Sequence, residues 1–140
     1  MKRYLLIAWS VLWMPVAVFV AQKLRVQLLP GQYQWDMMAH FLGGFSIAYG
    51  TLNLLRALPK KLIGWPLTRF TLFVALVFST MFVGVCWEWY EWLAFHGTTG
   101  RYDGINFSEW AWWTDTLNDL LMDTLGATSY AIIIAMRKQK

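Results

Sequence analysis

The chain has 140 residues, of which 58 % are hydrophobic and only 14 % are charged, whereas about a quarter of the residues of a soluble domain carry a charge. This composition excludes an ordinary soluble domain and indicates a protein embedded in a lipid bilayer. The single cysteine, Cys86, excludes an internal disulfide and any multi-cysteine zinc module, and the net charge of +4 gives no case for nucleic-acid binding, because the basic residues follow membrane topology.

Four apolar segments have about the length needed to cross a hydrocarbon core of roughly 30 Å as helices. In chain order they are residues 4–21, 36–55, 70–93 and 115–136. The first segment follows two basic residues, as a secretory signal does, but it has no small-x-small cleavage site, and we expect it to be retained as an anchor. The sequence therefore predicts an all-α, integral membrane four-helix bundle that forms a single transmembrane domain over residues 1–140.

The basic residues predict the orientation of these helices, because Lys and Arg accumulate on the cytoplasmic side of short loops. If four helices alternate, nine of the twelve basic residues fall on one side, and only Lys23, Arg25 and Arg101 fall on the other. We expect cytoplasmic N- and C-termini, external loops at 22–35 and 96–114, and a proline-rich internal turn between residues 57 and 68.

Tryptophan is concentrated toward the predicted outer face, which seven of the ten indoles approach: Trp35, Trp87, Trp89, Trp92, Trp110, Trp112 and Trp113. Indole rings favour the membrane interface, so one interpretation is an aromatic belt. The alternative is a binding surface for a lipid-like substrate at the outer leaflet. Small residues in the last three segments, among them Gly44, Gly84 and Gly126, mark places where helices can approach closely.

All eight acidic residues fall on the outer half of the predicted bundle. Counting about 1.5 Å per helical residue from the nearest cytoplasmic Arg places His40 about 24 Å up, Glu88 about 28 Å up, and Asp119 and Asp123 about 27 and 21 Å up. Residues three or four apart share one face of a helix. Each of three helices thus presents one polar stripe: Asp36 with His40, Glu88 with Glu91, and Asp115 with Asp119 and Asp123.

These carboxylates outnumber the cations on their side, so they would repel one another unless protonated or neutralised by a bound metal. A site rich in oxygen with one imidazole suits zinc, manganese, iron, magnesium or calcium. We expect a divalent metal with His40, Glu88, Asp119 and Asp123 as inner ligands, and Asp36, Asp115 and Glu91 as outer or alternative ligands. The alternative is that Asp36 and Asp115 cap helix N-termini, while the others pair with Arg101 or carry protons.

Two further residues are candidates for catalytic roles beside such a metal. Glu91 is a candidate general base for a metal-activated water. Arg101, in the glycine-rich external loop, is a candidate anion-binding group for a phosphate or carboxylate, or else it balances the nearby acids. Serine or cysteine catalysis is not expected, because no histidine is suitably placed beside a serine and Cys86 is predicted to lie deeper than His40.

The order and spacing of these motifs resemble those of a known group of membrane proteins. The motifs are Asp36-x-x-x-His40-Phe41, Trp87-Glu88-Trp89-Tyr90-Glu91-Trp92, Gly100-Arg101, Asp115-Thr116-Leu117-Asn118-Asp119 and Asp123-Thr124-Leu125-Gly126-Ala127. From Asp36 to Ala127 the chain resembles the YjdF-like and broader VanZ-like families of small bacterial inner-membrane proteins. That resemblance implies a multi-pass location in the inner membrane and, through a VanZ-like member associated with teicoplanin resistance, work in the cell envelope.

Three functions remain open from the sequence. The first is a metal-dependent inner-membrane hydrolase or transferase that acts on an envelope lipid or lipid-linked phosphate at an outward-facing carboxylate/His site. The second is non-enzymatic binding or handling of a divalent metal or of protons. The third is a small structural or immunity-type membrane partner. Membrane lipids are the partners that all three imply, and the sequence leaves the oligomeric state open.

Overall fold

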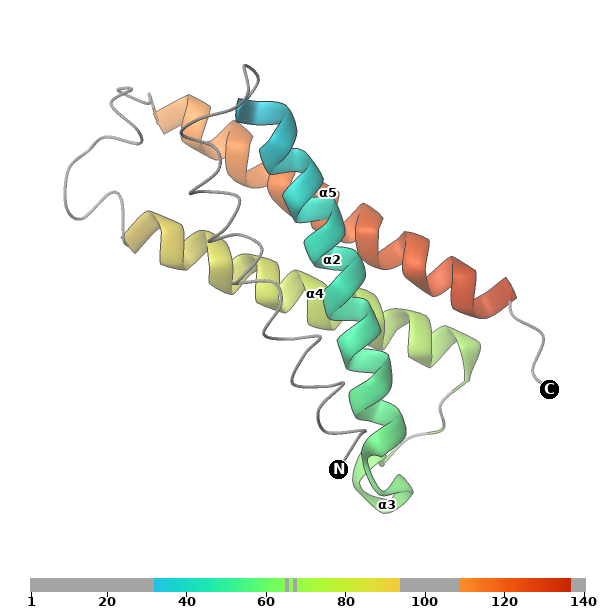
Figure 1. Cartoon of the computed structure of the whole chain (residues 1–140). Coiled ribbons are helices and arrows are strands. Elements are labelled where there is room, and N and C mark those ends of the chain that lie inside the picture. The colour runs from blue at the N-terminus through green and yellow to red at the C-terminus, as the bar shows by residue number, and fades with distance from the viewer. Residues whose placement is uncertain (1–31, 65, 67, 94–108, 137–140) are drawn as a thin grey trace.

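The computed structural model describes residues 32–64, 66, 68–93 and 109–136. Within these residues the chain forms three long helices and one short one (Figure 1): α2 (Gln32–Ala57), α3 (Lys60–Ile63), α4 (Arg69–Glu91) and α5 (Glu109–Met136). The predicted spans 36–55 and 70–93 coincide closely with α2 and α4, and the span 115–136 lies inside α5. The predicted span 4–21 and the candidate residue Arg101 lie outside the described residues.

The connection from α2 to α4 is determined by residues that stop and restart helices. α2 ends at Ala57, two residues before Pro59, which precedes α3. Gly64 ends α3 in the left-handed conformation, with a φ of 68°, which a residue without a Cβ adopts at little cost. Thr68 then caps α4, because its hydroxyl accepts a hydrogen bond of 3.1 Å from the backbone N–H of Thr71.

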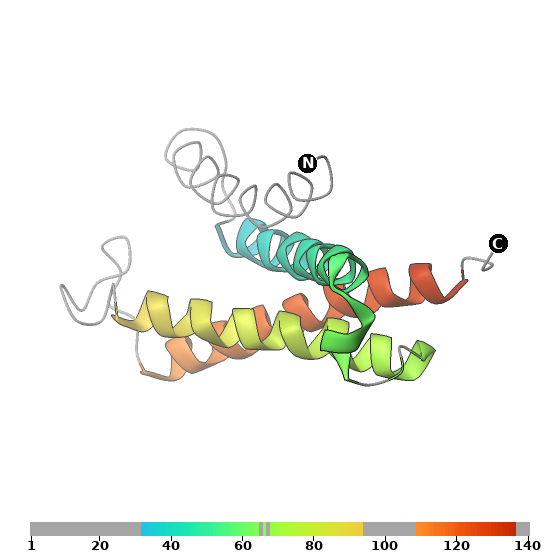
Figure 2. The ribbon, with the colours of Figure 1, turned by 90° about the horizontal axis from the view of Figure 1, so that it is seen from below.

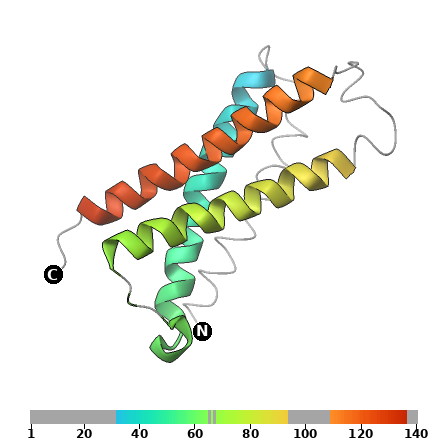
Figure 3. The ribbon, with the colours of Figure 1, turned by 180° about the vertical axis from the view of Figure 1, so that it is seen from behind.

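The three long helices form two layers. α4 and α5 run side by side in opposite directions, and α2 crosses them both (Figure 1). Seen from below, α2 lies on one face of the α4 and α5 pair (Figure 2), and the view from behind shows the same crossing (Figure 3). The start of α2, the end of α4 and the start of α5 therefore lie at the same end of the bundle.

Glycines allow α2 and α5 to approach until their backbones touch. A Cβ on Gly44 would clash with the backbone carbonyl of Asp123, and a Cβ on Gly126 would clash with the backbone carbonyl of Phe41. Such close approach is characteristic of helix packing through small residues in membranes. It joins the middle of α2 to the middle of α5, next to the acidic residues in the first half of α5.

On the side of this crossing away from the acidic residues, an apolar core holds the helices together. Leu76 of α4 and Ala127 and Ala131 of α5 are almost fully buried. The ring of Tyr130 is buried against Phe45, with ring centroids 5.0 Å apart in an edge-to-face arrangement, and lies 5.8 Å from the ring of Tyr49. A hydrogen bond of 2.8 Å between the hydroxyls of Thr51 and Ser79 also joins α2 to α4.

Two of the described helices are long and apolar enough to cross a membrane, namely α4 over Arg69–Glu91 and α5 over Trp113–Met136. Only 17 % and 33 % of their apolar windows are buried inside the bundle, so most of their apolar surface faces outward, as lipid contact requires. α2 does not reach the same hydropathy, because His40, several glycines and hydroxyl side chains interrupt its apolar sequence.

Candidate metal centre

The inward face of α4 changes from apolar to charged along its length. Its buried residues recur every four positions, namely Leu76, Thr80, Gly84 and Glu88, so they form one stripe along the helix. Glu88 belongs to the end of the bundle that also holds the start of α2 and the first half of α5. The described cations Arg56, Lys61 and Arg69 belong to the opposite end, where α2 ends and α4 begins.

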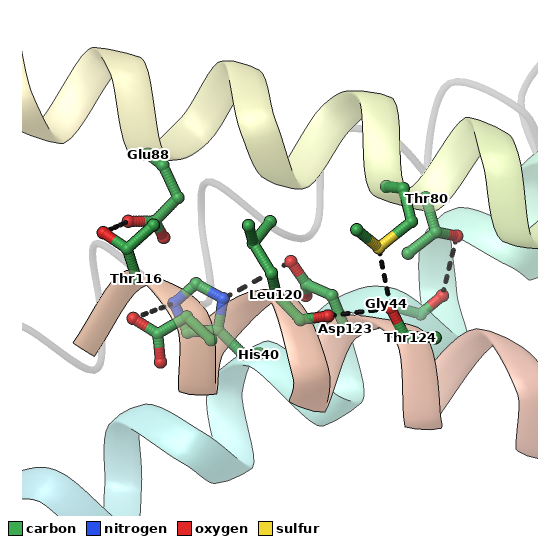
Figure 4. A network of polar contacts seen from close by, with 10 residues as sticks. His40, Gly44, Thr80, Glu88, Thr116, Leu120, Asp123 and Thr124 are labelled. Atoms are coloured by element: carbon green, nitrogen blue, oxygen red, sulfur yellow. Dashed lines mark hydrogen bonds and ion pairs between the residues drawn. The ribbon is translucent and has the colours of Figure 1, made fainter. Parts of the chain in front are cut away.

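His40 of α2 lies between two aspartates of α5 (Figure 4). Its Nε2 is 3.6 Å from Asp119 Oδ2, and its Nδ1 is 3.5 Å from Asp123 Oδ2. Both carboxylates are buried, with side chains 3 % and 5 % exposed. His40 of α2 and the two aspartates of α5, which were predicted to lie at a similar level, are thus close together, and each nitrogen of the imidazole faces one carboxylate.

Asp36 joins this contact from the preceding turn of α2. One ligand atom each from Asp36, His40 and Asp119 lie within 4.8 Å of one another, and this is the one such group among the described residues. Two atoms that share an ion at about 2.1 Å can be at most about 4.2 Å apart, so small side-chain rotations would suffice. The donor set of one imidazole and two carboxylates fits a divalent metal.

The 3.6 Å separation between His40 Nε2 and Asp119 Oδ2 is itself informative. It exceeds the 2.7–3.2 Å range of an N–H···O hydrogen bond. Both this separation and the 3.5 Å between His40 Nδ1 and Asp123 Oδ2 are close to the spacing of about 3.4 Å between neighbouring ligands of a tetrahedral ion with bonds of about 2.1 Å. The group that contains Asp119 and not Asp123 therefore makes Nε2 the candidate ligand atom. Because the two nitrogens of an imidazole point in divergent directions, an ion on Nε2 would leave Nδ1 for Asp123, the usual arrangement of a histidine ligand with a carboxylate behind it.

Asp123 is packed tightly against α4 on the other side of the imidazole and is not in the group of three ligand atoms. A Cβ at Gly84 would lie 2.6 Å from Asp123 Oδ2 and 3.1 Å from Leu120 Cδ2. Asp123 is only 4 % exposed. The glycine on α4 thus provides the space that the carboxylate fills, and Asp123 is suited to orient His40.

Glu88 lies beside this group without joining it. Its Oε2 accepts a hydrogen bond of 2.7 Å from the hydroxyl of Thr116, and the side chain approaches the site from α4 (Figure 4). Glu91 and Asp115 are half-buried at the same end of the bundle, and neither is in the group of three. The structure thus brings Asp36, His40 and Asp119 together and leaves Glu88, Glu91, Asp123 and Asp115 out of that group, and the metal-ligand role of every one of these residues remains a prediction.

The helix boundaries decide against the capping alternative for Asp36 and Asp115. α2 begins at Gln32 and has no acidic residue in its first turn. α5 begins at Glu109, so Asp115 also lies beyond the first turn. A cap serves the unpaired N–H groups of the first turn only. Both helices begin several residues before the apolar segments that were predicted to start at 36 and 115.

Two functional candidates were not predicted from the sequence. Thr116 orients Glu88, and Gly84 accommodates Asp123. The helical phase that Thr116 shares with Asp119 and Asp123 was visible in the sequence, but the partner on α4 was not. Gly84 was recognised as a packing position, whereas its contact with a carboxylate depends on how α4 and α5 are rotated.

The fold and the site together define an all-α membrane protein with a buried histidine and carboxylate cluster near one end of its helices. The chain matches the family described as "Predicted membrane protein (DUF2238)" over residues 3–140, and it belongs to that family. No curated protein and no solved structure matches it.

Proposed function

We propose that the protein is a metal-dependent membrane enzyme that acts on an envelope lipid or lipid-linked phosphate. The observation that carries this proposal is the group formed by Asp36, His40 and Asp119, whose ligand atoms lie within 4.8 Å of one another. A divalent ion there would polarise a phosphoryl or acyl oxygen and activate a water molecule. It would also neutralise carboxylates that have no described Lys or Arg at their end of the bundle.

Exposed aromatic side chains support a substrate at the membrane interface. Trp89, Tyr90 and Trp92 at the end of α4, and Trp113 near the start of α5, are 71 %, 58 %, 50 % and 64 % exposed. Tryptophan and tyrosine favour the level of the lipid headgroups. Along α5, Asp119 of the metal group lies within about two helical turns of Trp113, so a lipid headgroup could reach the group while the acyl chains stay in the bilayer.

The proposal extends to topology and location. With four spans and cytoplasmic termini, this end of the bundle faces outward across a bacterial inner membrane. The resemblance to YjdF-like and VanZ-like proteins supports a role in the cell envelope. Arg101 in the external loop would then be available to bind the anionic part of the substrate.

Element analysis of the detergent-purified full chain is the first test. We expect close to one divalent metal per chain in the wild type and less than a tenth of an equivalent in His40→Ala. His96→Ala, which replaces the other histidine of the chain, is the matched control and should keep the metal. A wild type that contains no metal and is not stabilised by zinc, manganese, iron, magnesium or calcium would exclude the metal site.

The reaction is tested separately, by comparing the envelope lipids of cells that express the wild type or His40→Ala. We expect a change in a lipid or lipid-linked phosphate that depends on His40. If metal is bound and the lipids stay identical, the protein is a non-enzymatic metal handler. If Asp119→Asn and Glu88→Gln change neither function nor thermal stability, the protein is a structural partner.

A further inference from the structure

Only one of the two carboxylate oxygens of the buried Glu88 has a hydrogen-bond partner among the described residues. The residue is 8 % exposed, and its Oε2 accepts the hydroxyl hydrogen of Thr116 at 2.7 Å. Its Oε1 is also buried and has no hydrogen-bond partner among the described residues. A buried acceptor without a partner is costly, because it has lost its water and gained nothing in return.

The position of this oxygen points to a ligand in the metal centre. Glu88 projects from α4 toward α5, beside His40 (Figure 4), and His40 and Asp123 are among the ionisable groups close enough to act on its charge. A carboxylate oxygen accepts hydrogen bonds or binds cations. The missing partner is therefore a hydrogen-bond donor or an ion within the site.

The geometry favours a donor over direct contact with the ion. Glu88 is absent from the group of ligand atoms that lie within 4.8 Å of one another, whereas Asp36, His40 and Asp119 form it. The hydrogen bond from Thr116 also fixes the Glu88 carboxylate in its present orientation. A carboxylate that lies beside the ligands without joining them is suited to contact a water molecule on the ion.

We propose that Glu88 Oε1 accepts a hydrogen bond from a water molecule bound to the metal, and that Thr116 holds the carboxylate for this role. This inference rests on the metal site proposed above and assigns the proton acceptor within it. A divalent ion bound there would make its water more acidic, and Glu88 Oε1 would accept the proton that this water releases. Glu88 thereby takes the role that the sequence assigned to Glu91.

Cobalt and infrared measurements on the full chain test this assignment without a substrate. Co²⁺ added to the metal-free protein reports its ligands through visible absorption. In parallel, the infrared difference between zinc-loaded and metal-free protein, with ¹³C-labelled glutamate, reports the glutamate carboxylates, and the chain contains only Glu88, Glu91 and Glu109. The variants are Glu88→Gln, Thr116→Val and Glu91→Gln, the last of which removes the competing candidate one turn away on the same helix.

The expected result separates Glu88 from the ligands. The cobalt spectrum should be the same in the wild type and Glu88→Gln, whereas Asp119→Asn should alter it. Zinc should shift one carboxylate band by the amount typical of a new hydrogen bond. That shift should vanish in Glu88→Gln, weaken in Thr116→Val and persist in Glu91→Gln.

Other outcomes overturn the inference in distinguishable ways. A cobalt spectrum changed by Glu88→Gln makes Glu88 a metal ligand, and the metal site survives. A zinc-induced band shift that disappears in Glu91→Gln instead returns the role to Glu91. If the wild type binds neither Co²⁺ nor zinc, both the metal site and this inference are excluded. Circular dichroism of each variant establishes that the helices are intact.

Discussion

Replacing Gly84 with alanine perturbs the contact that holds the imidazole of His40 in place. The new Cβ would lie 2.6 Å from Asp123 Oδ2 and 3.1 Å from Leu120 Cδ2. Since ordinary van der Waals contact begins at 3.4 Å, the carboxylate would have to retreat by at least about 0.8 Å. Asp123 Oδ2 is 3.5 Å from His40 Nδ1, so the retreat would release or rotate the imidazole.

The effect should be larger on metal binding than on folding. Loss of the carboxylate behind a histidine ligand typically lowers metal affinity by about 10- to 100-fold. Overpacking one methyl group in a buried contact costs about 1–3 kcal/mol of stability. Zinc competition titration in detergent measures the affinity, and thermal unfolding of the metal-free protein measures the stability separately.

A double variant shows whether the effect passes through Asp123. Asp123→Asn alone should weaken binding, because an amide oxygen is a weaker acceptor than a carboxylate for the Nδ1–H of a metal-bound, neutral imidazole. If Gly84→Ala acts through the same contact, the double variant should lose little more than the stronger single variant. The reasoning is refuted if Gly84→Ala binds zinc within twofold of the wild type, or if the two losses simply add.

Three further outcomes are expected. Asp119→Asn should reduce zinc affinity more than Asp123→Asn, because Asp119 faces the nitrogen of the imidazole that is open to an ion; equal losses in titration would contradict this. Gly126→Ala should lower the melting temperature more than Gly84→Ala does, since it forces two helix backbones apart, and an unchanged melting temperature would disprove the close crossing. Thr51→Val removes the hydrogen bond to Ser79 and should lower the free energy of unfolding by only about 0.6 kcal/mol, the average for a hydrogen bond between membrane helices. A loss of several kcal/mol would mean that the pair does more than join α2 to α4.

The ends of the described helices show where sequence patterns fall short. The apolar segment predicted from residue 115 is the membrane-crossing part of a helix that begins at Glu109. The apolar pattern marks only the residues that lie in the lipid, whereas backbone hydrogen bonds continue the helix into the polar interface. This extension places Asp115 beyond the first turn and excludes its capping role.

Among the side chains of the site, too, the sequence pattern predicted some features and missed others. Helical spacing correctly predicted that Asp119 and Asp123 share a face and lie at the level of His40. It did not predict that the two carboxylates meet different nitrogens of one imidazole, because that depends on the angle at which α2 crosses α5. The ligand role that it gave Glu88 remains a prediction, because the structure turns one of its oxygens to Thr116 and leaves the other without a described partner.

The sequence by itself determined that this is an all-α membrane protein and that its acidic residues gather at one end of the helices. Composition and helical period are properties of the chain alone, and lipid imposes them strictly because it offers backbone groups no hydrogen bonds. The tertiary structure alone decided which of the polar residues touch. Gly44, Gly84 and Gly126 allow three helices to approach. The rotation of the packed helices then brings Asp36, His40 and Asp119 together and puts Asp123 and Glu88 next to this group.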